Sequence, residues 1–143
     1  MNIENIIRQS TLLGVLGTFS KKEYAEFGKL VRSPLYVAGR NLYPLYSLLG
    51  KYHPDFKSPT AAENMKKEKI FEKLYPGTGY NEKKSSTILR RLFSDLNKQA
   101  EEYLLLLALR SNTLKREYFL TEELISRNLD ANYKKHIRKI DEF

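Results

Sequence analysis

The sequence predicts an all-α protein, and three observations support this fold class. Apolar residues recur every three or four positions along most of the chain, as on the buried face of a helix. Capping residues, glycines and prolines stand at the ends of these periodic segments. No segment alternates between apolar and polar residues as a strand does. We therefore expect a bundle of six or seven helices, with one long central helix and a C-terminal αα-hairpin, in a single domain over residues 1–143.

The first two helices of this bundle are expected near the N-terminus. Apolar residues share one face from Asn2 to Leu16, which predicts the first helix. Ser20 and Glu23 have the spacing of a capping box, in which each side chain accepts a hydrogen bond from the other residue's backbone amide. This box predicts a second helix from Lys21 to Arg32, which ends before Pro34 because proline disfavours a helical residue ahead of it.

Two further helices are expected before the middle of the chain. Asn41 is a candidate cap for the third helix, which ends before the His53-Pro54 pair. The fourth helix begins at either Thr60 or Lys66. The segment from Tyr75 to Gly79 ends it, because that segment contains one proline and two glycines.

The remaining part of the chain is predicted to form the long helix and the hairpin. No Gly or Pro occurs from Tyr80 to Phe143, and Asn81 can cap a helix that reaches Arg110. Ser111-Asn112 is the expected turn into the final helical segment, which we expect to be interrupted between Asn128 and Asp130. The apolar residues of this segment are expected to face back onto the bundle: Leu114, Tyr118, Ile125, Leu129, Tyr133, Ile137 and Ile140.

The composition excludes several classes of function. The chain has no Cys, which excludes disulfides, thiol catalysis and Cys-ligated metal sites, and only two His. The longest apolar run, Tyr103 to Leu109, is far shorter than the roughly 20 residues that span a bilayer. His53 lies near Asp55, but no nucleophile is tied to this pair. We therefore expect a cytoplasmic protein that is not an enzyme, with no catalytic residue, cofactor, metal or membrane association.

Basic residues outnumber acidic ones, 25 to 17, and the first hundred residues carry the net charge of +8. Several of these cations lie on one face of the long helix, nearly opposite its apolar residues. We name this set the basic stripe: Lys83, Lys84, Arg90, Arg91 and Lys98. Such a face can neutralise the phosphates of a nucleic acid. It is equally typical of an ordinary solvated helix face.

The same helix ends in a segment, Leu104 to Leu109, that is apolar on every side. Leu105 and Leu109 lie in the angular sector of the basic stripe, so elements packed against the first half of the helix cannot bury them. A helix that is apolar all round must be covered all round. We expect the helix after Ser111 to cover these two leucines, and the alternative is a partner chain.

A second candidate surface lies between the second and third helices. We name it the tyrosine surface, and its residues are Tyr36, Arg40 and Tyr43. Tyr and Arg are over-represented at binding hot spots, and their planar groups also suit stacking on bases. The alternative for such tyrosines is a core position with the hydroxyl at the rim, which we expect for the nearby Tyr46.

Short segments of this sequence resemble a known protein family. They are SPLY at Ser33–Tyr36, KYHPDF at Lys51–Phe56, KIFEKLYPG at Lys69–Gly77 with Tyr80-Asn81 after it, and SRNLD at Ser126–Asp130. Together they resemble the N-terminal region of a family of long, uncharacterised helix-rich bacterial proteins whose C-terminal parts are stacked helix pairs. The resemblance implies that this chain is the N-terminal module of a longer helical protein, and it implies no particular activity.

Residues 67–98 have a weaker, local similarity to the helix-turn-helix of winged-helix transcription factors. A short helix, a Pro-Gly turn and a longer basic helix follow one another there. Two features depart from that motif. No strand pair follows to make a β-hairpin wing, and the turn from Pro76 to Tyr80 is longer than the usual three or four residues.

These surfaces lead us to expect a non-catalytic helical protein-interaction module. It would bind a protein partner, or a second copy of itself, through the tyrosine surface or the apolar end of the long helix. The alternative is a nucleic-acid-binding domain that uses the basic stripe.

Overall fold

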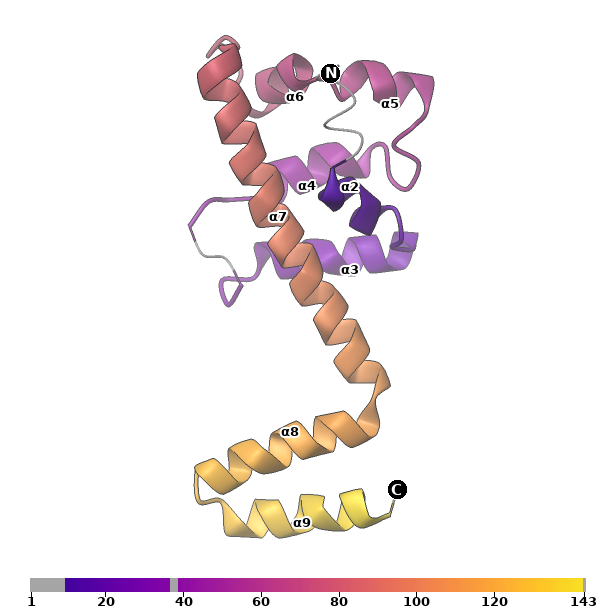
Figure 1. Ribbon diagram of the computed structural model, residues 1–143, viewed down its shortest axis with the longest axis vertical. Coiled ribbons are helices and arrows are strands. Elements are labelled where there is room, and N and C mark those ends of the chain that lie inside the picture. The colour runs from indigo at the N-terminus through magenta and orange to yellow at the C-terminus, as the bar shows by residue number, and fades with distance from the viewer. Residues whose placement is uncertain (1–9, 37–38, 143) are drawn as a thin grey trace. The chain divides into compact units, whose positions relative to one another are not determined.

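The computed structural model describes residues 10–36 and 39–142, and within these ranges the protein is helical without strands (Figure 1). The described helices are α2 (Thr11–Leu16), α3 (Lys21–Arg32), α4 (Tyr43–Gly50), α5 (Pro59–Asn64), α6 (Lys67–Leu74), α7 (Glu82–Ser111), α8 (Thr113–Ser126) and α9 (Asp130–Asp141). The predicted all-α class, the long helix and the C-terminal helix pair are confirmed.

The chain forms two compact units, Met1–Tyr103 and Leu104–Phe143. We call them the N-terminal unit and the C-terminal unit. The N-terminal unit holds α2 to α6 and most of α7, and the C-terminal unit holds the end of α7 with α8 and α9. Among the described residues, no helix combines the length and the hydropathy needed to cross a membrane.

The predicted capping box begins α3 as expected. The Ser20 amide donates to Glu23 Oε1 at 2.8 Å, and the Glu23 amide donates to Ser20 Oγ at 3.1 Å. Two amides of the first turn that have no partner within the helix are satisfied in this way. The helix then runs from Lys21 to Arg32, the bounds that the sequence predicts.

An aromatic cluster forms the core of the N-terminal unit. Phe27 of α3 is fully buried, with the ring centroids of Phe19 and Tyr103 at 5.5 and 5.8 Å from its own. Tyr24 of α3 stacks on Tyr46 of α4 with a centroid distance of 4.6 Å. Since Tyr103 belongs to α7, the cluster joins the N-terminal helices to the long helix. The N-terminal helices therefore pack on α7 as far along as Tyr103.

The buried face of α7 has the three-to-four spacing that the sequence predicts. Its buried residues are Ser85, Ser86, Leu89, Leu92, Leu96, Ala100 and Tyr103, all in the N-terminal unit. At about 100° per residue they occupy one side of the helix. The opposite side is therefore left to polar residues.

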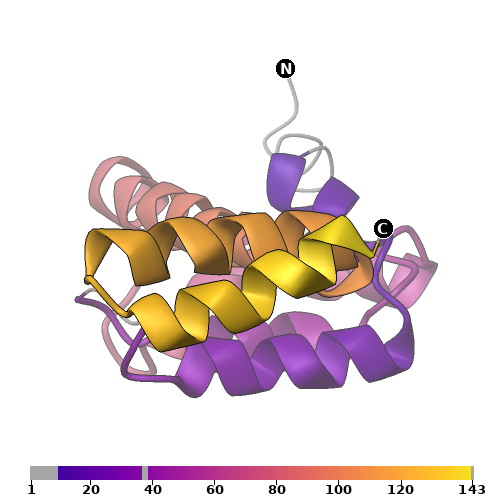
Figure 2. The ribbon, with the colours of Figure 1, turned by 90° about the horizontal axis from the view of Figure 1, so that it is seen from below.

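The helices α8 and α9 lie side by side as a hairpin, which both ribbon views show (Figure 2). Between them the chain turns at Asn128, whose φ is +59°. The Leu129 amide donates to the Leu124 carbonyl at 2.9 Å, the long-range bond of a Schellman motif. Asn tolerates the left-handed conformation better than most residues, so the predicted interruption at 128–130 is confirmed and explained.

The structure differs from the predicted N-terminal boundaries at three places. Residues 2–9 of the expected first helix lie outside the described residues. The Ser10 backbone is extended and its hydroxyl accepts from the Leu13 amide at 3.3 Å, so Ser10 caps the helix that begins at Thr11.

The other two differences concern the third and fourth helices. Asn41 accepts from the Tyr43 amide at 3.1 Å, yet the helix begins at Tyr43, later than a direct Asn41 cap would place it. A helix begins within one residue of each expected start of the fourth helix, at Pro59 and at Lys67. Ser58 caps α5, and α6 begins after Lys66, so two short helices replace one.

Candidate interaction surfaces

The basic stripe lies on the exposed side of α7, opposite the buried face. All five cations are solvent-exposed, and within the part of the chain that the structure describes none of them is in an ion pair. The structure therefore brings together the residues that the sequence groups. A row of exposed cations without acidic partners is available to an anion.

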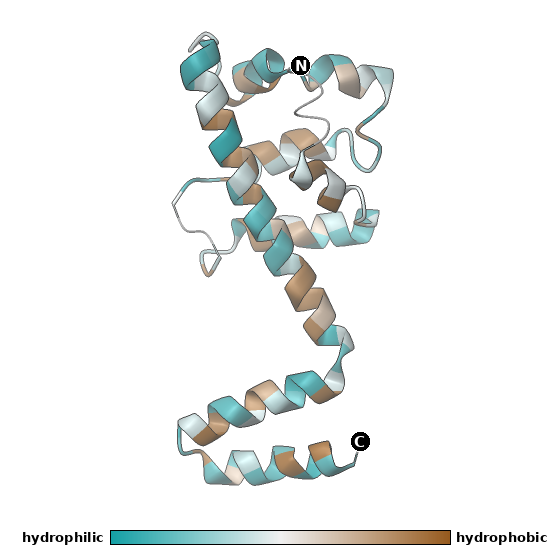
Figure 3. Ribbon diagram, viewed as in Figure 1, coloured by the Kyte–Doolittle hydropathy of each residue, from teal (hydrophilic) through white to brown (hydrophobic). Residues whose placement is uncertain are grey.

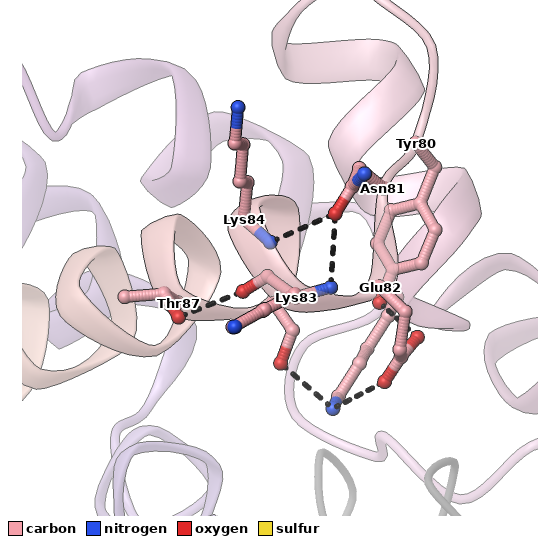
Figure 4. A network of polar contacts seen from close by, with 8 residues as sticks. Tyr80, Asn81, Glu82, Lys83, Lys84 and Thr87 are labelled. Atoms are coloured by element: carbon pink, nitrogen blue, oxygen red, sulfur yellow. Dashed lines mark hydrogen bonds and ion pairs between the residues drawn. The ribbon is translucent and has the colours of Figure 1, made fainter.

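The N-terminal end of this stripe is fixed by the cap of α7 (Figure 4). Asn81 Oδ1 accepts from the backbone amides of Lys83 and Lys84, each at 3.1 Å, while the Thr87 hydroxyl donates to the Lys83 carbonyl at 2.9 Å. Glu82 lies beside these cations and accepts a hydrogen bond from the Tyr80 hydroxyl at 2.7 Å. Burial, and next this contact with Glu82, raises the pKa of the Tyr80 hydroxyl above its ordinary value.

The tyrosine surface is only partly assembled. The Arg32 guanidinium lies 3.9 Å from the centre of the Tyr43 ring, a cation–π contact. These two residues line a hollow of about 450 Å³ together with Val31, Pro34, Gly39 and Asn41. Tyr36 is half-buried and Arg40 is exposed, and residues 37–38 between them lie outside the described ranges.

Tyr46 takes the core position expected for it. Its hydroxyl donates to the Tyr24 carbonyl at 2.7 Å, and the Tyr24 hydroxyl donates to the Tyr46 carbonyl at 2.6 Å. His53 stacks on the Tyr24 ring at 4.4 Å between centroids. This imidazole therefore takes part in the packing of the aromatic cluster.

The C-terminal unit exposes the third surface, which we call the apolar patch. The end of α7 in this unit is hydrophobic (Figure 3), and Leu105 is 61% exposed. Among the described residues of this unit, the exposed large apolar side chains are Leu104, Leu105, Leu114, Tyr118, Phe119, Leu120, Ile125 and Leu129. Leu105, Leu109, Tyr118 and Phe119 line a hollow of about 560 Å³ at the junction of α7 and α8.

Two predictions about this unit are wrong. The helix after Ser111 does not cover Leu105, and Leu109 is only partly covered. Four residues expected to face back are exposed, namely Leu114, Tyr118, Ile125 and Leu129. The reason is that α8 packs on α9 through a narrow face, on which only Thr121 and Leu124 are buried.

Polar groups occupy part of the space between α8 and α9. Glu117 of α8 is largely buried, contacts the His136 imidazole, and lies 3.9 Å from the Lys139 ammonium. Among the described residues, the buried Thr121 hydroxyl has no hydrogen-bond partner. Because this small hairpin buries few apolar side chains, much of its apolar surface stays in contact with solvent.

The sequence indicates Leu105 and Leu109 but misses Tyr118, Phe119 and Leu120 as surface residues. The sequence does contain a pattern that indicates the exposure of these three residues. Three consecutive apolar residues at about 100° intervals point to almost every side of a helix, so one neighbouring helix cannot bury all three. A short two-helix unit leaves the remainder exposed.

Comparisons of this chain with models of known protein families, with curated proteins and with solved structures find no match. The resemblance to the long helix-rich bacterial family and the local similarity to a helix-turn-helix therefore stay predictions. The described residues contain no group of three or more acidic or His side chains placed to hold a metal ion.

Proposed function

We propose that this chain is a non-catalytic, cytoplasmic protein-interaction module that binds through the apolar patch of its C-terminal unit. The observation that carries this proposal is the exposure of eight large apolar side chains between Leu104 and Leu129. Large apolar side chains exposed in such number are typical of protein-binding sites, because a partner removes them from water. The hollow lined by Leu105 and Phe119 supplies a concave centre for such a contact.

Site-specific photocrosslinking tests this proposal. Benzoylphenylalanine replaces Phe119, and in a control chain it replaces Tyr75, an exposed ring of the N-terminal unit. After irradiation in cells, position 119 should give defined crosslinked products and position 75 should not. Equal, diffuse or absent products from the two positions would contradict the proposal.

The basic stripe supports a second candidate function, binding to nucleic acid. Its five cations are exposed on one helix face, with no acidic partner among the described residues. Flexible Lys and Arg side chains on such a face can neutralise successive backbone phosphates. Affinity should then fall steeply with salt, with a log-log slope of about 4.5 at most for five phosphate contacts.

A charge-matched pair of variants tests this second function. Arg90→Glu with Arg91→Glu should strongly weaken binding to duplex or single-stranded nucleic acid and lower the salt slope by about 2. Lys21→Glu with Lys22→Glu makes the same change in net charge on the exposed side of α3 and should leave most of the affinity. Equal losses would indicate diffuse attraction by the basic half. No binding by the parent protein near physiological salt would remove this candidate.

A further inference from the structure

Helix α8 carries an antisymmetric pattern of charge centred on Phe119. Lys115 and Arg116 lie four and three residues before this ring, and Glu122 and Glu123 lie three and four residues after it. All four charged residues are exposed, and Phe119 is 57% exposed. The exposed surface of α8 is therefore positive at one end, apolar at the centre and negative at the other end.

These five residues lie on one face of the helix. At about 100° per residue they occupy a sector of about 120°. The buried residues Thr121 and Leu124 lie on the opposite side, toward α9. The charge pattern therefore belongs to a single surface that the hairpin leaves open.

The order of charges along this face, basic toward the N-terminus and acidic toward the C-terminus, is unfavourable for α8 by itself. A helix carries partial positive charge at its N-terminus and partial negative charge at its C-terminus, so acidic residues stabilise the first turn and basic residues the last. Helix α8 has no acidic residue in its first turn and no basic residue in its last. The four charges of this face add to the macrodipole instead of offsetting it, while Arg127 at the C-cap opposes it at the C-terminal end. A second helix of the same polarity, laid antiparallel, would compensate both ends.

We propose that the occupant of this face is the α8 helix of a second copy of this chain, laid antiparallel across a two-fold axis at Phe119. This inference rests on the proposed function and names the partner. The two-fold operation brings Lys115 beside Glu122 and Arg116 beside Glu123 of the second copy, and each contact occurs twice. No other register of the antiparallel pair matches all four charges.

The centre of this face suits an isologous contact. The two Phe119 rings meet near the axis, and the hollow lined by Leu105, Leu109 and Tyr118 lies beside each ring. An aromatic anchor next to a concave apolar site, surrounded by charged residues, is the usual anatomy of a protein interface.

The charged groups are free to form these contacts. Within the described part of the chain, Lys115, Arg116 and Glu122 have no side-chain ion pair. Glu123 pairs with Arg127 at 3.3 Å, but both side chains are more than two-thirds exposed. Such an exposed pair contributes little and exchanges readily for another.

Sedimentation velocity of the full chain over a range of concentrations tests the proposal. The parent protein should dimerise. Lys115→Glu with Arg116→Glu makes the face wholly acidic, and Glu122→Lys with Glu123→Lys makes it wholly basic. Each double variant should raise the dimer dissociation constant by about tenfold or more, because four attractive contacts become repulsive. Circular dichroism confirms that each variant remains helical.

Mixing the two variants separates this geometry from a general loss of folding or charge. An equimolar mixture should restore a dimer, since every contact in the mixed pair is again between opposite charges. Lys134→Glu with Lys135→Glu, on exposed positions of α9, is the control and should leave the parent's dimer unchanged. A dimer that survives both α8 double variants, or a mixture that stays monomeric, would overturn the antiparallel α8 pairing.

A parent protein that is monomeric at every concentration would also overturn this inference. The crosslinking at position 119 then distinguishes the two proposals. Products that contain a different protein would leave the proposed function standing without self-association. The absence of any specific product would remove both.

Discussion

The contact between Tyr24 of α3 and Tyr46 of α4 shows how a single residue, Gly28, allows two helices to approach closely. Each hydroxyl donates to the other residue's carbonyl, and the rings stack at 4.6 Å. The Tyr46 ring can reach α3 because position 28 is a glycine. A Cβ placed at Gly28 would lie 2.4 Å from the Tyr46 hydroxyl oxygen. A glycine is therefore required at position 28, because the Tyr46 ring lies so close to the α3 backbone. Helix α3 forms despite the lower helix propensity of this glycine.

Gly28→Ala should destabilise the protein by roughly 1–3 kcal/mol. The Tyr46 ring is held by the hydrogen bond from its hydroxyl to the Tyr24 carbonyl and by stacking on the Tyr24 ring, so it cannot move aside without losing contacts. Gly14→Ala in α2 is the matched control, since no atom lies within 4 Å of a Cβ there. It should be neutral or stabilising by up to about 1 kcal/mol. Urea unfolding measures both, and equal effects would show that the close approach has no cost.

Because of Tyr24 and Tyr46, we expect the protein to lose stability at alkaline pH. Burial first, and the neighbouring Tyr46 next, raises the pKa of Tyr24, and burial with the nearby Tyr43 raises that of Tyr46. In the unfolded chain both tyrosines ionise near pH 10. Above that pH the unfolded state releases more protons than the folded state, so stability falls as pH rises.

The fall should reach up to about 1.4 kcal/mol per pH unit for each buried tyrosine. Urea midpoints measured from pH 8 upward should be flat to about pH 9 and then decline. Tyr24→Phe should make the decline shallower, whereas Tyr118→Phe, on an exposed ring, should not. A parent protein whose midpoint stays constant through pH 11 would refute the assignment.

At the scale of the single helix, the capping box at the start of α3 should contribute measurably to the stability of the protein. Ser20→Ala removes the acceptor for the Glu23 amide and should cost about 1 kcal/mol. Ser47→Ala, at an exposed position inside α4, should change stability by less than about 0.5 kcal/mol. Thermal or denaturant unfolding compares the two serines. If their effects coincide, the capping box does not stabilise α3.

Helix boundaries were predictable where the residue that ends or begins the helix acts on backbone groups close to it in the sequence. Ser20, Asn81 and the turn at Asn128 act within four residues of their own position, and the sequence locates all three. The helix start at Thr11 was missed because the apolar periodicity of the sequence continues through Ser10. This periodicity indicates which side of a helix is buried, and it does not mark a helix start at which the pattern keeps its phase.

At the scale of the whole molecule, the two units should differ in their resistance to opening. The N-terminal unit has an extensive core, whereas α8 buries two residues and α9 none among those described. Local opening is easiest where few apolar contacts must break. Amides of α8 and α9 should therefore exchange with deuterium well before those of α3 and of α7 between residues 85 and 103.

Hydrogen exchange followed by mass spectrometry at low protein concentration measures this difference. A concentration dependence of the exchange from α8 would itself report association. Equal protection of α3 and α9 in the dilute protein would contradict the division into units of unequal stability.

The candidate surfaces could be predicted from the sequence to different extents. The basic stripe is a property of one helix, and the phase of Lys83 relative to Leu89 already places it away from the core. The apolar patch was predicted only at Leu105 and Leu109. Its larger part, around Phe119, depends on how much of α8 the hairpin covers.

The sequence by itself determined the helical class, the long helix, its caps and its basic face, because these follow from contacts within a few residues. The tertiary structure alone decided the approach of Tyr46 to Gly28, the division at Tyr103, and the exposure of Phe119. Burial depends on which segments meet in space, and apolar periodicity is the same whether an apolar side chain packs on its own chain, packs on a partner or stays in contact with water.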